Sequence, residues 1–177
     1  ISDRLAEKIC QLGAQEIIHI GKVGTLVSPK EIYRRVYIPS RFIVGRRFEI
    51  VCSDIAIRNS LSYNEEYISQ VHVSVATTME ETFKQRNSLK KLDVETIDIE
   101  SSKIAQAVSK FNINSEAKVR FGAIHFSTDY LKSADETDLS PKYDLSTEKI
   151  DQVNRKKDTI LNKIFELVRH HIVYPHV

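Results

Sequence analysis

Two carboxylic acids stand where two apolar runs of the sequence end. Glu100 follows the run at 94–99, and Asp129 follows the run at 119–126. If the two runs form parallel strands, both acids lie at the carboxyl edge of one sheet, where open α/β folds bind their ligands. A carboxylic acid at such an edge can act as a general acid worth about 10²–10⁴-fold in rate, provided that burial keeps it protonated near neutral pH. The alternative is that the two acids only cap helices or line a loop.

The segment between these two runs has the spacing of a helix. Apolar residues recur there at three- and four-residue steps, which is the pattern of an amphipathic helix. They are Ile104, Ala107, Val108 and Phe111. A strand, a helix and a second strand in succession predict a β-α-β crossover, in which the two strands are parallel.

The N-terminal part of the chain predicts a helix, a strand and a glycine turn. Residues 2–13 carry an apolar stripe between a capping residue and a glycine, which predicts a helix. Residues 16–20 form a compact strand candidate that runs directly into residues 21–25. Gly21 and Gly24 permit a tight turn beside a ligand there. The alternative is an ordinary connection from a strand to a loop.

The middle of the chain is rich in β-branched and aromatic residues. Residues 31–57 predict two or three strands, and residues 70–76 alternate cleanly, which predicts another strand. His72 lies within that alternation, and we interpret it as a packed or surface side chain. Several arginines of this region could hold a phosphate, but alternation along strands favours a solvated face. They are Arg34, Arg35, Arg41, Arg46 and Arg47.

The C-terminal half ends in a long helix. Residues 83–92 predict a charged helix, and residues 132–147 predict an exposed loop that could move over a site. The last helix is expected to begin near residues 146–147. Histidines at its end could bind a metal ion, but no ligand carboxylate or helical histidine spacing accompanies them, so we expect a surface tract and no metal site. They are His170, His171 and His176.

The composition is that of an ordinary globular chain. The 177 residues are 41% hydrophobic and 28% charged, which fits one domain. The net charge of +2 gives no reason to expect a nucleic-acid partner, and no apolar segment approaches the roughly 20 residues of a membrane span. Cys10 and Cys52 lie far apart, so we interpret them as small hydrophobic residues and expect a cytoplasmic protein. The chain starts at Ile1, which indicates a processed chain or an excerpt.

Four segments occur in the order, and at about the spacing, that is seen in one enzyme superfamily. The most specific is I-D-I-E-S at 97–101, which resembles the V/I-D/E-M-E-S/A motif of the nucleoside phosphorylase and nucleosidase superfamily, with Ile99 in place of methionine. That superfamily includes purine nucleoside and uridine phosphorylases, methylthioadenosine/S-adenosylhomocysteine nucleosidase and AMP nucleosidase. The other segments are I-I-H-I-G-K-V-G-T-L at 17–26, V-H-V-S-V-A-T-T-M-E-E-T-F at 71–83 and F-S-T-D at 126–129.

The resemblance implies a role for residues in each segment. Glu100 matches the glutamate that hydrogen-bonds the ribose hydroxyls, and Ile99 matches the methionine that packs under the sugar. Asp129 matches the aspartate that acts at the purine nitrogen in purine-specific members, with Thr128 in the serine position. Phe83 matches the aromatic residue that stacks on the base. The remaining implied contacts are Thr78 with the base, and Gly21, Lys22, Gly24 and Thr25 with phosphate.

The resemblance also implies a fold and an activity. The expected fold is a three-layer α/β/α phosphorylase-like domain over residues 1–177, with a mixed central sheet flanked by helices and without the family's N-terminal portion. Cleaving an N-glycosidic bond builds positive charge on the sugar and negative charge on the departing base, so a carboxylate near the ribose and a proton donor near the base both suit the reaction. We therefore expect phosphorolysis or hydrolysis of a nucleoside or nucleotide by a homo-oligomer. Phosphate is a potential co-substrate, and no other cofactor is expected.

Two alternative functions stay open. The first is a non-catalytic homologue that binds a nucleoside-like ligand or a protein partner. Lys22, Thr25 and the missing N-terminal phosphate loop favour this alternative. The second is a doubly wound domain that binds another anionic metabolite at the same edge, because a fold alone does not fix a function.

Overall fold

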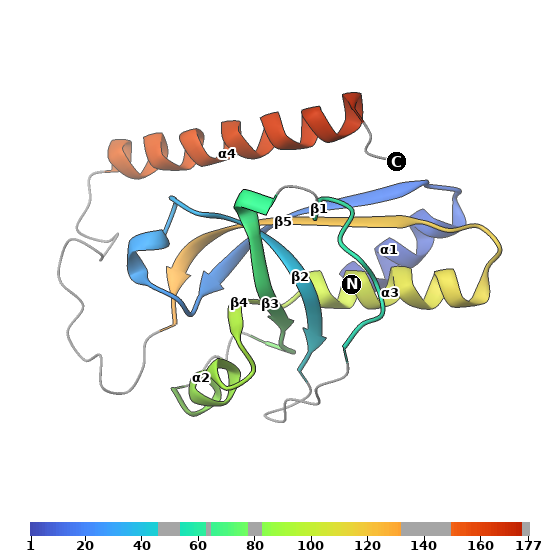
Figure 1. The fold of residues 1–177 in the computed structure, drawn as a ribbon, viewed down its shortest axis with the longest axis horizontal. Coiled ribbons are helices and arrows are strands. Elements are labelled where there is room, and N and C mark those ends of the chain that lie inside the picture. Colours follow the sequence, from blue (N-terminus) through green and yellow to red (C-terminus); the bar gives the residue numbers. More distant parts are fainter. Residues whose placement is uncertain (46–53, 63–64, 78–82, 132–149, 175–177) are drawn as a thin grey trace.

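A computed structural model describes residues 1–45, 54–62, 65–77, 83–131 and 150–174. Within these residues the chain has a mixed α/β structure, in which helices flank a closed sheet (Figure 1). The strands are β1 (Glu16–Thr25), β2 (Val36–Val44), β3 (Ile68–Ser74), β4 (Val94–Asp98) and β5 (Arg120–Tyr130). The helices are α1 (Ser2–Gln11), α2 (Phe83–Lys90), α3 (Ser101–Asn114) and α4 (Ile150–Val173), with short 3-10 turns η1 (Pro29–Glu31) and η2 (Glu65–Tyr67).

The strands close into a barrel in the order β1, β4, β3, β2 and β5. Strand β1 runs parallel to β5 and pairs antiparallel with β4 at its last two residues, Gly24 and Thr25. Strand β3 is parallel to both β2 and β4, and the antiparallel contact of β2 with β5 closes the ring. A mixed central sheet with flanking helices confirms the predicted fold class.

Helices cover both faces of the sheet. Figure 1 shows α4 along one side of the strands, with α1 and α3 side by side on the other. Strand β5 is apolar on both faces for this reason: Phe121 and Ala123 pack in the cluster that contains residues of α1 and α3, whereas Ile124 and Phe126 pack with Ile160 of α4. Burying a large apolar side chain contributes about 1.5–3 kcal/mol, so both layers stabilise the sheet that positions the site.

Most of the predicted elements are confirmed. The helices expected at 2–13 and 83–92 correspond to α1 and α2, and the strand expected at 70–76 corresponds to β3. The helix between the two acids is α3, and the last helix is α4. Among the described helices, none is both long enough and apolar enough to cross a membrane. The loop expected at 132–147 lies outside the described residues.

Two sequence predictions about the strands are wrong. Residues 21–25 are not a turn, because β1 continues through both glycines to Thr25. Strands β4 and β5 are not parallel neighbours: β1 lies between them, parallel to β5 and antiparallel to β4. The sequence spacing of a crossover does not reveal that a third strand is inserted between its two strands. In the region 31–57, the described residues form one named strand, β2.

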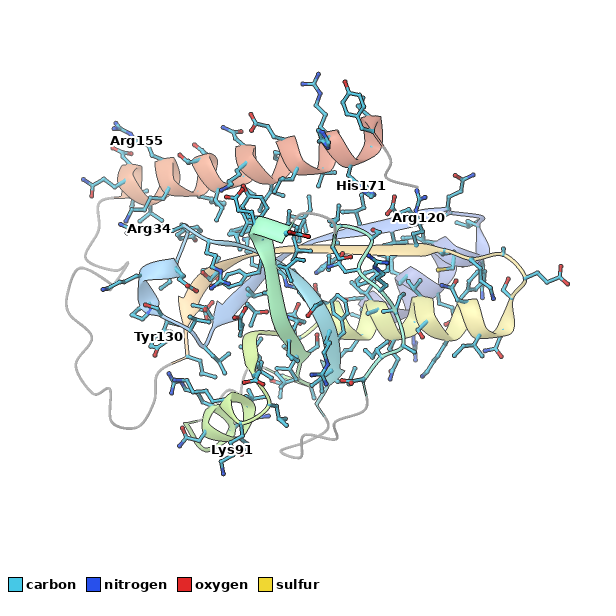
Figure 2. All side chains as sticks on the ribbon, in the orientation of Figure 1. Arg34, Lys91, Arg120, Tyr130, Arg155 and His171 are labelled. Carbon is cyan, nitrogen blue, oxygen red and sulfur yellow. The ribbon has the colours of Figure 1, made fainter. Side chains whose placement is uncertain are left out.

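The C-terminal part of α4 is attached to the start of β1 by a partly buried charge cluster. His171 Nε2 lies 2.9 Å from Glu16 Oε1, and Arg120 donates a hydrogen bond to Glu16 Oε2 at 3.2 Å. Figure 2 shows His171 and Arg120 near each other at this end of the molecule. Burial opposes ionisation of Glu16, but hydrogen bonding by Ser60 and His171 and the charges of His171 and Arg120 together outweigh it and lower the pKa of Glu16 below its ordinary value of 4.5.

The lowered pKa of Glu16 predicts a loss of stability in acid. A carboxyl group that is more acidic in the folded chain stabilises the fold above its ordinary pKa, and this contribution disappears as the pH falls through the lowered value. We therefore expect the wild-type chain to melt at a higher temperature than the Glu16→Gln variant near pH 7, with the difference shrinking below about pH 4.5. Melting curves of both chains across this range check the prediction, and a constant difference would contradict it.

Candidate functional site

Glu100 lies at the point where β4 passes into α3. It is the N-cap residue of α3, its side chain is exposed, and its Oε1 accepts a hydrogen bond from Ser2 Oγ of α1 at 3.0 Å. The neighbouring Ile99 keeps 39% of its surface exposed. A carboxylate and an apolar side chain therefore face solvent together, which is the pair that the resemblance assigns to the ribose. That assignment stays a prediction.

Asp129 is positioned by an irregularity in the pairing of β1 with β5. Val23 pairs with Ser127 and Gly24 pairs with Asp129, so Thr128 is an extra residue in β5. Such bulges re-aim the side chains that follow them. The exposed Asp129 carboxylate lies over β1, and a Cβ atom built on Gly24 would be 3.0 Å from Asp129 Oδ2. Thr128 Oγ1 donates a hydrogen bond of 2.8 Å to Asp129 Oδ1.

The end of β1 lies between the two acids. Gly24 pairs with Asp129 on one side and with Ile97 of β4 on the other, three residues before Glu100. The crossover predicts that the two acids lie at the ends of neighbouring strands. This prediction is wrong, because β1 lies between β4 and β5. A ligand that contacts both acids must extend across β1, past the Asp129 and Ile97 side chains that flank Gly24.

The residues implied for phosphate all belong to β1. Lys22 is exposed, whereas Gly21, Gly24 and Thr25 are buried. The Thr25 hydroxyl lies 3.0 Å from Tyr37 Oη and 3.4 Å from Glu31 Oε2. Because the Thr25 hydroxyl is already hydrogen-bonded within the fold, only backbone groups of this residue could contact phosphate. The phosphate role of the set stays a prediction.

The residues implied for the base are described only in part. Phe83 is the first residue of α2, and the position of its side chain lies outside the described structure, as does all of Thr78. The helix itself is fixed to the end of β5. Arg86 is almost completely buried, and it donates hydrogen bonds to Tyr130 Oη at 2.7 Å and to the carbonyl oxygen of Leu131 at 2.5 Å.

Sequence analysis missed a group of ionisable side chains beneath the start of α3, which we name the histidine–aspartate cluster. Its members are His19 of β1, His72 of β3, Asp98 of β4 and His125 of β5. His72 Nε2 lies 3.0 Å from Asp98 Oδ1, and the His72 and His125 rings are 4.5 Å apart between centroids. His72 is thus a packed side chain, as predicted, but it packs against other ionisable groups.

Asp98 is the centre of hydrogen bonding in this cluster. Its carboxylate accepts hydrogen bonds from the hydroxyls of Ser74 and Ser101, and from the backbone N–H of Ser101 at 3.0 Å. Burial opposes ionisation, but the charge and hydrogen bond of His72, with the hydrogen bond of Ser101, hold the pKa of Asp98 below its usual range. The buried carboxylate therefore acts as a cap for the N-terminus of α3, where its negative charge is favoured.

Burial favours the uncharged form of the other two histidines. Burial lowers the pKa of His125 well below its ordinary value, and it lowers the pKa of His19 in the same direction. His125 Nε2 lies 3.0 Å from Ser101 Oγ, but His125 Nδ1 has no hydrogen-bond partner among the described residues. A fully buried nitrogen without a partner is uncommon in protein interiors.

Gly21 gives the two histidines their space, which leads to a stability prediction. A Cβ atom at Gly21 would lie 2.9 Å from His125 Cδ2 and 3.0 Å from His19 Nε2. We expect Gly21→Ala to lower the free energy of unfolding by about 1–3 kcal/mol, as overpacking does. Urea denaturation measures this. Lys22→Ala, an exposed change on the same strand, is the control and should stay within about 0.5 kcal/mol of wild type. Equal free energies of unfolding for the two variants would contradict the close packing of His19 and His125 against Gly21.

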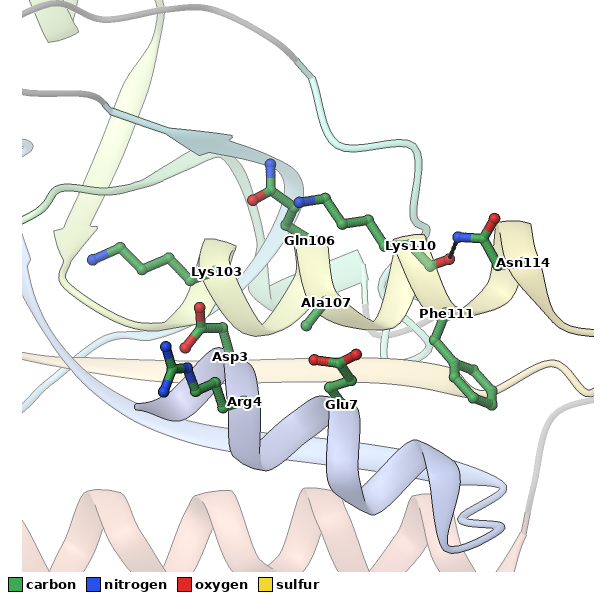
Figure 3. A pocket seen from close by; sticks show the side chains of 9 residues that line it. All are labelled: Asp3, Arg4, Glu7, Lys103, Gln106, Ala107, Lys110, Phe111 and Asn114. Carbon is green, nitrogen blue, oxygen red and sulfur yellow. Dashed lines mark hydrogen bonds between the residues drawn. The ribbon is translucent and has the colours of Figure 1, made fainter.

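A groove of about 360 Å³ lies between α1 and α3, away from the two acids (Figure 3). Figure 3 shows Asp3 and Glu7 of α1 pointing toward α3, whose Ala107 and Phe111 lie on the side nearest to α1. Neither Glu100 nor Asp129 lines the groove. The groove is therefore separate from the site predicted from sequence.

The mixed sheet with helices on both faces gives a phosphorylase-like α/β fold, which solved structures share. A methylthioadenosine phosphorylase from an antarctic soil metagenomic library superposes with a TM-score of 0.62 at 12% identity, over 99% of this chain and 66% of that one. A futalosine hydrolase mutant of Helicobacter pylori strain 26695 gives 0.61 at 15% identity, over 96% and 74% of the two chains. The 5′-methylthioadenosine nucleosidase of Arabidopsis thaliana gives 0.58 at 15%, over 94% and 67%. At these identities the similarity establishes the fold alone.

Sequence comparison adds one curated relative. The chain is 25% identical over 175 residues to "Oxidoreductase cns1" of the fungus Cordyceps militaris, an alignment that covers 95% of this chain and 22% of that protein. The chain thus spans about a fifth of this relative, so the relative's name describes a protein most of which has no counterpart here. No protein-family model matches the sequence.

Proposed function

We propose that this chain cleaves the N-glycosidic bond of a nucleoside and releases the base. The observation that carries the proposal is the placement of two exposed carboxylates, Glu100 and Asp129, on either side of the glycine-containing end of β1. The shared fold supports it, because the solved structures with this fold include a nucleosidase, a phosphorylase and a hydrolase of nucleoside-like compounds.

The two acids have different tasks in this reaction. Glu100 accepts hydrogen bonds from the ribose hydroxyls and places negative charge near the sugar, where positive charge develops. Ile99, exposed beside it, packs under the sugar. Asp129 is exposed in the free chain, so the bound base has to cover its carboxyl group and keep it protonated. It then donates a proton to the purine nitrogen as the bond to the sugar breaks, so that the base leaves without a full negative charge. The resemblance assigns the contact with the base to Phe83, the first residue of α2.

A purine nucleoside is the substrate class that we propose. Among the solved structures with this fold, a methylthioadenosine phosphorylase from Schistosoma mansoni was determined with tubercidin, and Helicobacter pylori methylthioadenosine/S-adenosylhomocysteine nucleosidase with butyl-thio-DADMe-Immucillin-A. The nucleophile is either phosphate or water, since these structures include both phosphorylases and hydrolases. Exposed Lys22 on β1 is the side chain that would attract phosphate. We also propose that the chain works as a homo-oligomer.

The test is incubation of the chain with inosine, adenosine, uridine, methylthioadenosine and AMP, each with and without phosphate. Chromatography of the products is expected to show a free purine base from at least one of the purine compounds. A requirement for phosphate identifies phosphorolysis, and release without phosphate identifies hydrolysis. No release of a base from any compound under either condition would count decisively against the proposal.

A second candidate is a non-catalytic protein that binds a nucleoside-like ligand or a protein partner. The occupied hydroxyl of Thr25 favours it, since that side chain is turned toward Tyr37 and Glu31 rather than toward a phosphate. This candidate predicts that a purine nucleoside raises the melting temperature while no base is released. Measurable turnover would exclude it.

A further inference from the structure

Three side chains of the histidine–aspartate cluster are arranged to hold one metal ion. They are His19, Asp98 and His125, and one potential ligand atom from each lies within 4.8 Å of the other two. These residues are far apart in sequence, and the closing of the barrel brings β1, β4 and β5 together. We propose that they bind a divalent first-row transition metal ion, with Zn²⁺ as the reference ion. The site goes beyond the proposed glycosidic activity and does not depend on it.

The three ligand atoms can reach one ion through small movements. Atoms within 4.8 Å of one another all lie within about 2.8 Å of a common point, whereas zinc bonds to nitrogen and oxygen are about 2.0–2.2 Å long. Each side chain therefore has to move by less than about 1 Å. Gly21 keeps this space open: His19 Nε2 and His125 Nε2 lie 3.0 and 3.4 Å from the position that its Cβ atom would take.

The chemistry of the three side chains suits such an ion. Two imidazole nitrogens and one carboxylate oxygen are ligands that zinc and its neighbours in the periodic table accept, and they leave further positions for water or another ligand. His72 and Ser74 hold the Asp98 carboxylate from behind, as hydrogen-bond partners of metal ligands commonly do. The Nε2 atom of the fully buried His125 is directed into the cluster, since it lies 3.0 Å from the Ser101 hydroxyl, which also donates a hydrogen bond to Asp98.

The site is open to solvent on one side. His19 is half-buried and the Asp98 side chain keeps 8% of its surface exposed, whereas His125 is fully buried. Asp98 also accepts the backbone N–H of Glu100 at 3.0 Å, at the start of α3. A bound ion would therefore connect β1 and β5 to the segment that carries Glu100. The ion would fix the backbone from which the Glu100 side chain extends, without contacting the carboxylate.

The test is Zn²⁺ binding by the whole chain, prepared without a polyhistidine tag and stripped of metal with a chelator. Calorimetric titration is expected to give about one ion per chain, and the melting temperature should rise with the Zn²⁺ concentration because the ion binds the folded state. His19→Gln is expected to bind Zn²⁺ at least about 10-fold more weakly. Cobalt(II) should give a visible absorption band with the wild-type chain that the variant lacks.

The control variant is His170→Gln, which changes an exposed histidine of α4 in the C-terminal histidine tract. Its Zn²⁺ affinity is expected to equal that of the wild type. Circular dichroism verifies the fold of each variant, and Asp98→Asn serves as the second ligand variant if His19→Gln does not fold. The proposal is overturned if the wild-type chain binds no Zn²⁺. It is also overturned if folded His19→Gln binds Zn²⁺ as tightly as the wild type, or if His170→Gln is the variant that loses Zn²⁺ affinity.

Discussion

Replacing Asp129 with asparagine is expected to slow the release of a purine base by about 10²–10⁴-fold, which is the usual contribution of a general acid. Asparagine has nearly the same shape as the aspartic acid but lacks its acidic proton, so the base has to leave without protonation. Asp129 is exposed and asparagine has nearly the same volume, so the change should not disturb the packing of β1 and β5. The rate of base release at saturating nucleoside measures the effect.

The matched control for this variant is Asp151→Asn at the exposed start of α4. It removes the same charge from a position outside the site, and it is expected to leave the rate unchanged. Melting temperatures of both variants should stay close to that of the wild-type chain, because surface substitutions usually change stability by less than about 0.5 kcal/mol. A folded Asp129→Asn chain that releases the base at the wild-type rate would remove Asp129 from the reaction.

Replacing Asp98 with alanine is expected to lower the free energy of unfolding by about 3–5 kcal/mol, as breaking a buried ion pair does. The change removes the acceptor for His72 Nε2, for the hydroxyls of Ser74 and Ser101, and for the backbone N–H groups at the start of α3. The side-chain donors would stay largely buried without this partner, since Asp98 is almost completely enclosed, whereas the Glu100 N–H is exposed. Urea denaturation of the wild-type and variant chains measures the difference.

Asp54→Ala is the control for Asp98→Ala. Asp54 accepts two hydrogen bonds from Arg41 at 2.8 and 2.9 Å, but more than half of each side chain is exposed. An exposed ion pair contributes about 0–1 kcal/mol, so its loss should be small. If both aspartate variants lose the same free energy of unfolding, the buried hydrogen bonds of Asp98 stabilise the fold no more than an exposed ion pair does, which would contradict the prediction.

The parts of the fold that depend on local pattern were predictable. Ile104, Ala107, Val108 and Phe111 have helical spacing because α3 packs one face on the sheet, and the structure places them on that helix. Glu100 was correctly placed between a strand and a helix, since the apolar run ends where β4 ends. Local signals suffice for these features because each depends on neighbours within a few residues.

The parts that depend on how distant strands meet were not predictable. The long pairing of β1 with β5 overrides the tendency of Gly21 and Gly24 to form a turn, because the backbone groups of both residues find partners in β5. The bulge at Thr128 has no mark in the sequence, yet it decides where Asp129 lies. The signal that could have revealed the cluster is a second histidine at a core-facing strand position. His125 follows Phe121 and Ala123 at two-residue steps, so all three lie on one face of β5 and are buried.

A crystal structure of the Asp129→Asn chain with methylthioadenosine tests most directly whether Glu100 and Asp129 share one ligand, because this variant should bind the compound and cleave it far more slowly than the wild type does. In that structure the nucleoside is expected to extend across β1 at Gly24, with its ribose hydroxyls donating hydrogen bonds to Glu100 and its base beside residue 129. A nucleoside bound elsewhere, or one that contacts only one of these two positions, would contradict it.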